Sequence, residues 1–206
     1  IELAAVKMCN GQVIDRFERF ANPHESLSKT IRDLTGITDD MLVDAPEIDQ
    51  VLREFREFAS DSVLVAHNAR FDMGFLNAGY KKIGEPEMDN PVLDTLELAR
   101  FLMPELKNHR LNTLCDKLGV ELVSHHRAVY DAEATGHMLW KLILRLEERE
   151  IFDLIRINDH IGKGDWMRQR PFHVILLAKN QKGLRNLYIL VSKAHIEYYH
   201  RVPRIP

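Results

Sequence analysis

The sequence contains few cysteines, no long apolar run and no export signal, and each absence excludes a class of protein. Two cysteines in 206 residues rule out a disulfide-stapled scaffold and favour a reducing compartment. The longest apolar runs are only a few residues long, too short to cross a bilayer. Because no signal peptide is visible, we expect a cytoplasmic protein. With 45% hydrophobic and 29% charged residues, the chain is neither disordered nor collagen-like.

The charged residues are divided unevenly along the chain. Residues 151–206 hold ten Lys and Arg against four Asp and Glu, whereas residues 1–150 hold 18 against 27. This asymmetry indicates two units with different surfaces. We expect a first domain over residues 1–150, a linker over 151–170 and a partial second domain over 171–206. The excess of basic residues in 151–206 is consistent with nucleic-acid binding or with a differently solvated surface, and charge alone does not decide between these two interpretations.

The periodicity of apolar residues predicts alternating strands and helices. Two strand-like runs flank Asn10-Gly11, a dipeptide that favours a tight hairpin turn. Later apolar residues recur three and four apart, as in amphipathic helices, or form short buried strands. The strands are expected at 1–7, 13–20, 63–66 and 92–93, and the helices at 45–58, 71–82, 96–102, 111–118 and 129–148. This order predicts an α/β domain with a mixed sheet. A strand at 173–178 and a helix at 183–199 form a separate βα unit.

Two short clusters place acidic and imidazole side chains at helix starts. Residues 65–72 (VAHNARFD) include the end of an apolar strand and put Asp72 in the first turn of the next helix. A carboxylate there can bind a hard cation at the edge of a sheet, or cap its helix. Residues 125–132 (HHRAVYDA) put Asp131 at the start of the longest helix and His126 in the preceding loop. A neutral imidazole there can act as a general base, but each aspartate could also serve only as a cap.

Together the clusters resemble the second and third motifs of the DEDDh family of 3′→5′ exonucleases, and the likeness covers about residues 1–148. It implies an RNase H-like fold, with a mixed five-stranded sheet flanked by helices. It also implies two divalent metal ions, Mg²⁺ or Mn²⁺, bound by Asp72 and Asp131. By the same match, His126 is the base that activates the attacking water. Asn68 and Phe71 would lie near the terminal nucleotide.

The family's first motif, Asp-x-Glu on the first strand, does not occur near the start of this chain. Residues 1–6 resemble the segment that follows that motif, so Glu2 is no substitute for it. The chain also starts inside a strand-like run without an initiator methionine. We interpret both features as truncation, and predict that the fragment alone is a poor or inactive nuclease because half of the expected metal ligands are missing.

The last part of the chain, from residue 171 on, resembles a different domain. Residues 171–188 are similar to the later part of a PHP domain in bacterial replicative polymerase alpha subunits. In the PolC-type DNA polymerase III family an exonuclease is inserted within the PHP domain, which would give this order. The likeness implies DNA as a partner, at a single-stranded or frayed 3′ primer end, and replication components such as a sliding clamp. His173 is a candidate ligand for a further metal ion, or a histidine that is hydrogen-bonded to backbone.

We therefore expect the proofreading exonuclease region of a replicative DNA-directed DNA polymerase. Two alternatives remain. A stand-alone DEDDh exonuclease on DNA or RNA ends would have no need of the PHP-like remainder. A non-catalytic DNA-binding or scaffold module would account for the missing first motif.

Overall fold

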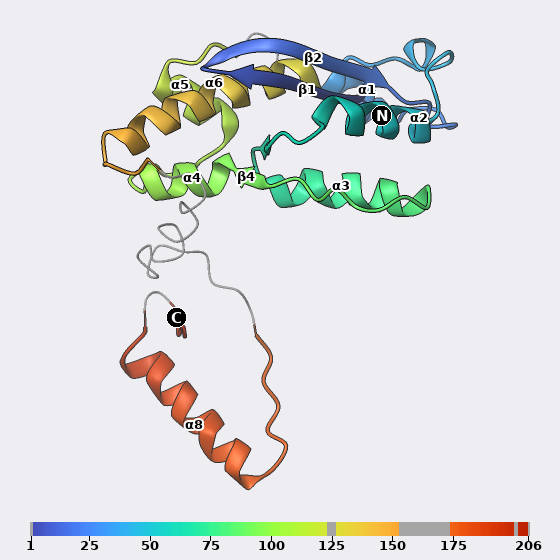
Figure 1. Ribbon diagram of the computed structural model, residues 1–206. Coiled ribbons are helices and arrows are strands. Elements are labelled where there is room, and N and C mark those ends of the chain that lie inside the picture. The colour runs from blue at the N-terminus through green and yellow to red at the C-terminus, as the bar shows by residue number, and fades with distance from the viewer. Residues whose placement is uncertain (1, 123–126, 153–173, 200–201, 206) are drawn as a thin grey trace. The chain divides into compact units, whose positions relative to one another are not determined.

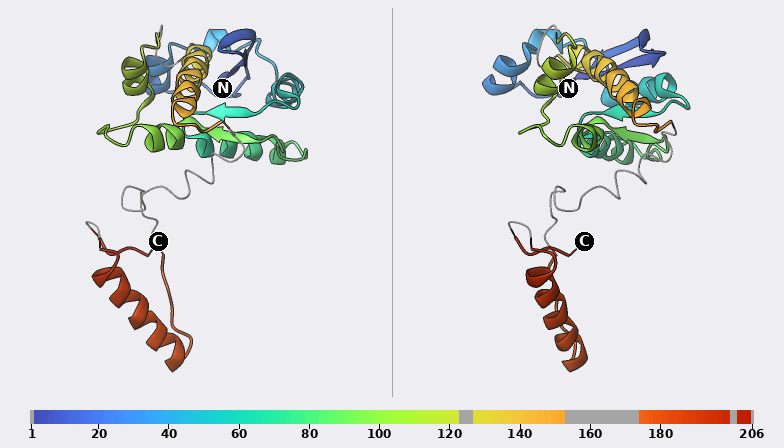
Figure 2. Two further views of the ribbon diagram at one scale, coloured as in Figure 1. Left: turned by 60° about the vertical axis from the view of Figure 1, so that its left-hand side comes forward. Right: turned by 90° about the vertical axis from the view of Figure 1, so that its left-hand side faces the viewer.

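The computed structural model describes residues 2–122, 127–152, 174–199 and 202–205 and divides the chain into two compact units. The first unit is Ile1–Phe152 and the second is Asp153–Pro206. Figures 1 and 2 show strands and helices in the first unit and one long helix in the second. The strands are β1 (Glu2–Cys9), β2 (Gln12–Phe20), β3 (Leu64–Ala66) and β4 (Val92–Asp94). The helices are α1 (Lys29–Thr35), α2 (Ile48–Ala59), α3 (Ala69–Lys82), α4 (Thr95–Leu102), α5 (Leu111–Leu118), α6 (Ala128–Glu147) and α8 (Gln181–Ile196), with a short 3₁₀ helix at Asp39–Met41.

The antiparallel hairpin of β1 and β2 turns at Asn10-Gly11, as predicted. Both residues have positive φ, 48° and 78°, which a two-residue hairpin turn requires and which Asn and Gly tolerate best. A Cβ atom added to Gly11 would lie only 2.8 Å from the ring of Trp140 on α6. Glycine at this turn is therefore favoured both by the backbone and by the close approach of α6.

The described strands form two separate two-stranded sheets, which corrects the expected single mixed sheet. β1 pairs with β2, and β3 pairs in parallel with β4, so that Ala66 lies opposite Asp94. Strands make one sheet only where neighbours exchange hydrogen bonds, and no described strand connects the two pairs. Helix α6 packs against β1, β2 and β3, so one helix supports both pairs.

The two faces of the hairpin pack against different helices because side chains alternate along a strand. Glu2 and Glu18 point to the start of α6, where both contact Arg127. Phe17 points to the opposite side, where its ring contacts the rings of Phe55 and Phe58 on α2. The first unit thus has a hydrophobic core around α2 and α3, and further buried side chains on α4, α5 and α6.

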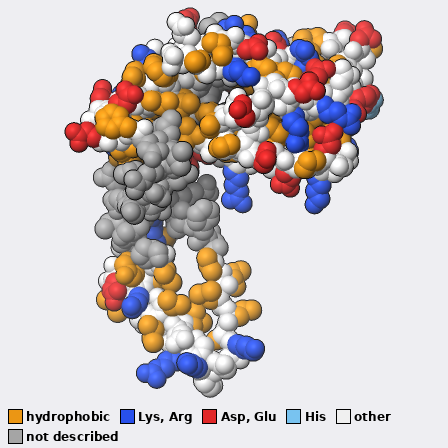
Figure 3. Space-filling model, in the orientation of Figure 1, with side chains coloured by type: hydrophobic (Ala, Val, Ile, Leu, Met, Phe, Trp, Pro, Cys, Tyr) orange, Lys and Arg blue, Asp and Glu red, His pale blue; other side chains and the backbone are white. Residues whose placement is uncertain are grey.

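The second unit differs from its prediction at one element. Residues 174–178 have no regular structure, although their apolar run predicted a strand. A strand needs a hydrogen-bonded partner, and the described residues offer it none. Helix α8 is present and carries exposed apolar side chains, among them Tyr188 and Ile196. Figure 3 shows Lys and Arg side chains near one end of this unit, whereas acidic and basic side chains are interspersed over the visible face of the first. Nothing among the described helices is long and apolar enough to cross a membrane.

Candidate active site

The site lies where the parallel strands β3 and β4 end and helices α3 and α4 begin. Asp94, the last residue of β4, joins these two helix starts. Its Oδ1 accepts hydrogen bonds from the backbone N–H groups of Leu96 (2.8 Å) and Asn68 (3.0 Å). Its Oδ2 accepts from the N–H of Ala69 at 3.0 Å. One carboxylate therefore caps α4 and also binds the first amides of α3.

Asp72 lies in the first turn of α3, which starts two residues earlier than predicted. Because Asp94 occupies the terminal amides, Asp72 is not needed as the cap of this helix. Partial burial raises the pKa of the Asp72 carboxyl, and the neighbouring negative charge of Asp94 raises it further. The residue's own backbone N–H and the nearby His67 act in the opposite direction. The charge of Asp94 thus bears on the pKa of Asp72, but less than burial does.

Asn68 and Phe71 lie together at one hollow on the outer side of α3. The hollow has a volume of about 470 Å³, and its lining also includes Arg70 and Phe75. Asn68 has φ 75° and ψ 52°, a left-handed conformation that asparagine adopts more readily than most residues. Its side chain makes no helix-capping hydrogen bond. The structure therefore brings together the two residues that the sequence assigned to the terminal nucleotide.

His67 belongs to a hydrogen-bonded network behind the start of α3. Its Nε2 lies 2.8 Å from the backbone oxygen of His109, so the ring donates there. Its Nδ1 lies 3.1 Å from the hydroxyl of Thr95, which is fully buried. Burial is the main effect on the pKa of His67 and lowers it. With both ring nitrogens engaged, His67 fixes the β3 end rather than offering a base to a substrate.

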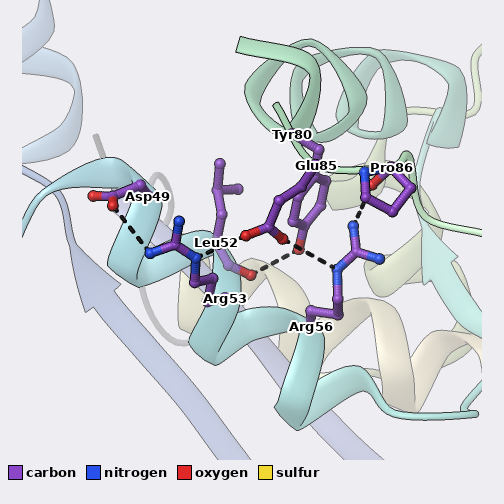
Figure 4. Close-up of polar contacts among 7 residues, drawn as sticks. All are labelled: Asp49, Leu52, Arg53, Arg56, Tyr80, Glu85 and Pro86. Atoms are coloured by element: carbon purple, nitrogen blue, oxygen red, sulfur yellow. Dashed lines mark hydrogen bonds and ion pairs between the residues drawn. The ribbon is translucent and has the colours of Figure 1, made fainter. Parts of the chain in front are cut away.

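The far half of α3 is fixed to α2 (Figure 4). The hydroxyl of Tyr80 is fully buried and donates to the backbone oxygen of Leu52 at 2.8 Å. The guanidinium of Arg56 lies over the Tyr80 ring, 4.2 Å from its centroid, and donates to the oxygen of Pro86. Glu85 accepts from Arg53 at 2.7 Å. These contacts fix the helix that carries Asp72 against the core.

Asp131 lies in the first turn of α6, and its Oδ1 is buried. The start of this helix is held by Glu2, whose side chain is only 6% exposed. Glu2 accepts from Nε of Arg127 at 2.9 Å and from the N–H of Ala128 at 3.2 Å. Burial first, and then the charges of Asp116 and Asp131, raise the pKa of Cys115 on α5 to about 11. Asp131 thus lies close to Cys115, while Glu2 holds the helix N-terminus.

The predicted residues are only partly brought together. Asn68, Phe71 and Asp72 share the start of α3, whereas Asp131 lies on α6. His126 and His173 lie outside the described residues. Within the described ranges, no group of three or more His, Cys, Asp and Glu side chains is placed to hold a metal ion.

The carboxylates of Asp72 and Asp131 are hard oxygen donors, the kind that Mg²⁺ and Mn²⁺ prefer. Their chemistry therefore fits the ions that the resemblance implies. Two carboxylates are nevertheless fewer than two dications need for charge balance. Asp72 and Asp131 would therefore supply only part of the ligands that a two-metal site needs.

Sequence reasoning gave no role to Asp94, His67 or Phe75. His67 comes directly after β3 and Asp94 is the last residue of β4, and this position at the carboxyl end of a strand was the available signal. Phe75 follows Phe71 by four residues, a spacing that puts both rings on one helix face.

Comparisons with known proteins find relatives that match the whole chain. Over all 206 residues the chain is 65% identical to "DNA polymerase III PolC-type" of Halalkalibacterium halodurans, and it is 58% identical to the Bacillus subtilis protein of the same name. It covers 14% of each of these relatives, so it spans only a small part of their length.

Solved structures show the same fold. "Exonuclease X in complex with 5′ overhanging duplex DNA" superposes with a TM-score of 0.56 at 27% identity, covering 69% of this chain and 81% of the other. A 3′-exonuclease that recognises the histone mRNA stem-loop has a TM-score of 0.53 at 17% identity, over 69% of this chain and 53% of the other. This α/β fold is that of RNase H-like exonucleases. Because residues 1–139 match the family RNase_T, described as Exonuclease, the chain belongs to that exonuclease family.

Proposed function

We propose that the first unit is the 3′→5′ proofreading exonuclease region of a PolC-type DNA polymerase III. The observation that carries the proposal is the start of α3, where Asp72 lies in the same helical turn as Asn68 and Phe71, two residues that line one hollow. The reaction is hydrolysis of the 3′-terminal phosphodiester, which releases a nucleoside monophosphate. The match to PolC-type polymerases over the whole chain favours DNA as the substrate over RNA.

The roles of the residues follow from their chemistry. Asp72 and Asp131 would hold two divalent cations, which supply charge neutralisation and an activated water when bound. His126 is the proposed general base, and Asn68 and Phe71 would hold the terminal nucleotide. A mispaired end separates from its template more easily than a paired one and can enter such a single-strand site.

The proposal requires two more carboxylates than the described residues provide. β1 pairs only with β2, and β3 only with β4, among the described strands. A strand that carries Asp-x-Glu and pairs with the free edges of β1 and β3 would supply both carboxylates. It would also convert the two pairs into one five-stranded sheet, with α6 across it.

We propose that the second unit is part of a PHP domain, with His173 as a candidate ligand for a further metal. Helix α8 begins at Gln181 after the cap Asn180, whose side chain accepts from the N–H of Gly183 at 2.9 Å. The exposed apolar side chains on α8 support packing against other parts of a larger protein, because an isolated helix seldom leaves so many in water. A replicative polymerase of this kind would also bind partners such as a sliding clamp.

The test uses the full-length polymerase that contains this chain. Substrates are 5′-labelled single strands and primed duplexes with a mispaired 3′ end, with Mg²⁺ present or chelated. We expect Asp131→Ala to abolish release of 3′ nucleotides, and His126→Ala to slow it with little change in DNA binding. Glu133→Ala is the matched control on α6, because that carboxylate pairs with Arg16 at 3.0 Å instead.

Undiminished nucleotide release in Asp131→Ala would overturn the metal-ligand assignment. If the wild-type polymerase binds the mispaired end but releases no nucleotides, the non-catalytic alternative replaces the exonuclease. Equal losses of DNA binding and hydrolysis in His126→Ala would make that histidine structural.

A further inference from the structure

The open end of the β1–β2 hairpin presents two carboxylates and an aromatic ring on one face. In the register of β1 with β2, Glu2 lies opposite Phe20. Glu18 lies opposite Ala4, two residues further along the same pair of strands. Because side chains alternate along a strand, Glu2, Glu18 and Phe20 share a face. Like charges so close on neighbouring strands destabilise a sheet, so this arrangement calls for a cation between them.

Arg127, the residue before α6, is that cation. Its Nε donates to Glu2 at 2.9 Å, and its Nη2 donates to Glu18 at 2.7 Å. The guanidinium carbon lies 5.7 Å from the centroid of the Phe20 ring. Glu2 is almost wholly shielded from water, and charge-assisted hydrogen bonds are stronger than neutral ones. We call Glu2, Glu18 and Arg127 the hairpin clamp.

The hairpin clamp is connected to Asp131 through the backbone. The side chain of Arg127 has only donors, so it cannot cap the helix amides that follow it. Glu2 supplies an acceptor instead, for the N–H of Ala128. The backbone oxygen of Arg127 accepts from the N–H of Asp131 itself, at 3.2 Å. Arg127 therefore joins the hairpin carboxylates to the first turn of α6.

A second ion pair joins the same two elements in a different way. Arg16 on β2 pairs with Glu133 on α6 at 3.0 Å. The side chain of Arg16 is 55% exposed, against 30% for Arg127. Exposed ion pairs contribute little, because water competes for both charges. Arg16 is thus a matched comparison for Arg127, with the same elements and the same chemistry but a more exposed position.

We propose that Arg127, held by Glu2 and Glu18, is a positioning residue for hydrolysis of the 3′-terminal phosphodiester. It fixes the first turn of α6, and through it the Asp131 carboxylate. Helix ends fray more readily than helix interiors, and a side chain that must hold a cation needs a fixed support. The inference rests on the proposed function, because the position of Asp131 affects the reaction only if that residue is a metal ligand.

The first experiment measures hydrogen exchange by mass spectrometry in the full-length polymerase, with divalent metal ions chelated. Arg127→Ala should speed exchange in peptides covering residues 128–131 by about tenfold, since hydrogen bonds to charged groups shift a local opening equilibrium by that order. Arg16→Ala should leave these peptides unchanged. Exchange in α5 is the reference for a general loss of stability. Glu18→Gln should stay closer to the wild type than Glu18→Ala, because the amide oxygen can still accept from Arg127.

The second experiment measures release of 3′ nucleotides from a single-stranded oligonucleotide over a range of Mg²⁺ concentrations. Arg127→Ala should lower kcat by about tenfold to a hundredfold, the range that small misplacements of catalytic groups produce. The KM for DNA should change by less than about twofold, because the clamp does not hold the substrate. The Mg²⁺ concentration for half-maximal rate should rise, which a smaller folded fraction would not cause. The double variant Glu18→Ala/Arg127→Ala should lose no more than Arg127→Ala alone, since both changes remove one interaction.

Unchanged exchange at residues 128–131 in Arg127→Ala would overturn the proposal. An unchanged Mg²⁺ requirement together with faster exchange would overturn it as well, because the clamp would then stabilise the fold without positioning Asp131. Failure of the wild-type polymerase to release nucleotides is a distinguishable result. It would contradict the proposed function itself, whereas the exchange experiment is measured without hydrolysis.

Discussion

Replacing Asp94 should destabilise the first unit by an amount that depends on which of its hydrogen bonds survive. Asp94→Ala removes the cap of α4, at a cost of about 1 kcal/mol. It also removes the two bonds to the amides of α3, for which we take about 1 kcal/mol each. The expected loss is about 3 kcal/mol. Asp94→Ser keeps a hydroxyl that can cap α4 but cannot reach α3, so about 2 kcal/mol should be lost.

Urea unfolding of the 206-residue chain, followed by far-ultraviolet circular dichroism, measures these differences as shifts in midpoint at constant slope. Asp61→Ala is the control, because no hydrogen bond or ion pair engages this exposed residue among the described ones. If Asp94→Ser were as stable as the wild type, the bonds to α3 would contribute nothing. Equal losses in the serine and alanine variants would instead show that the α4 cap is unimportant.

Two further predictions follow from titrating groups. Burial lowers the pKa of His67 below its ordinary 6.5, so the unfolded chain binds a proton near that pH while the folded chain does not. The free energy of unfolding should therefore fall as the pH drops below 6.5, and His67→Gln should flatten that dependence in urea titrations at several pH values. Burial raises the pKa of Cys115 to about 11, so its thiol stays protonated at pH 8. Iodoacetamide at that pH should label the exposed Cys9 in the native chain and Cys115 only after unfolding, as mass spectrometry of peptides would show.

Elements with local signals were predicted closely. Helix α5 has the expected bounds, Leu111–Leu118, because Gly119 ends it with φ 64° and its apolar residues are regularly spaced. Helix α3 starts at Ala69 rather than Phe71. Its terminal amides are bound by Asp94, 25 residues away, and no local pattern shows such a cap.

Other elements were missed for physical reasons that the sequence does not display. Helix α1 (Lys29–Thr35) has a cap at Ser28 and a left-handed Gly36 after it, but it buries no residue. Without a buried face there is no apolar periodicity to detect. At residues 174–178 the apolar composition predicted a strand that the structure does not have. Apolar composition suits a strand, but a strand also needs a neighbour to pair with, and the local sequence does not show whether one is present.

The sequence left two roles open for Asp72 and for Asp131, helix cap or metal ligand. In the structure, carboxylates of other residues bind backbone amides at the starts of both helices. At the start of α3 the amides are bound by Asp94, and at the start of α6 the first amide is bound by Glu2. Asp94 and Glu2 are strand residues, so each helix start is held from outside the helix. Asp72 is therefore not required to cap α3. We expect a carboxylate near a helix N-terminus that another residue caps to suit a cation site, because its position is set before the ion binds.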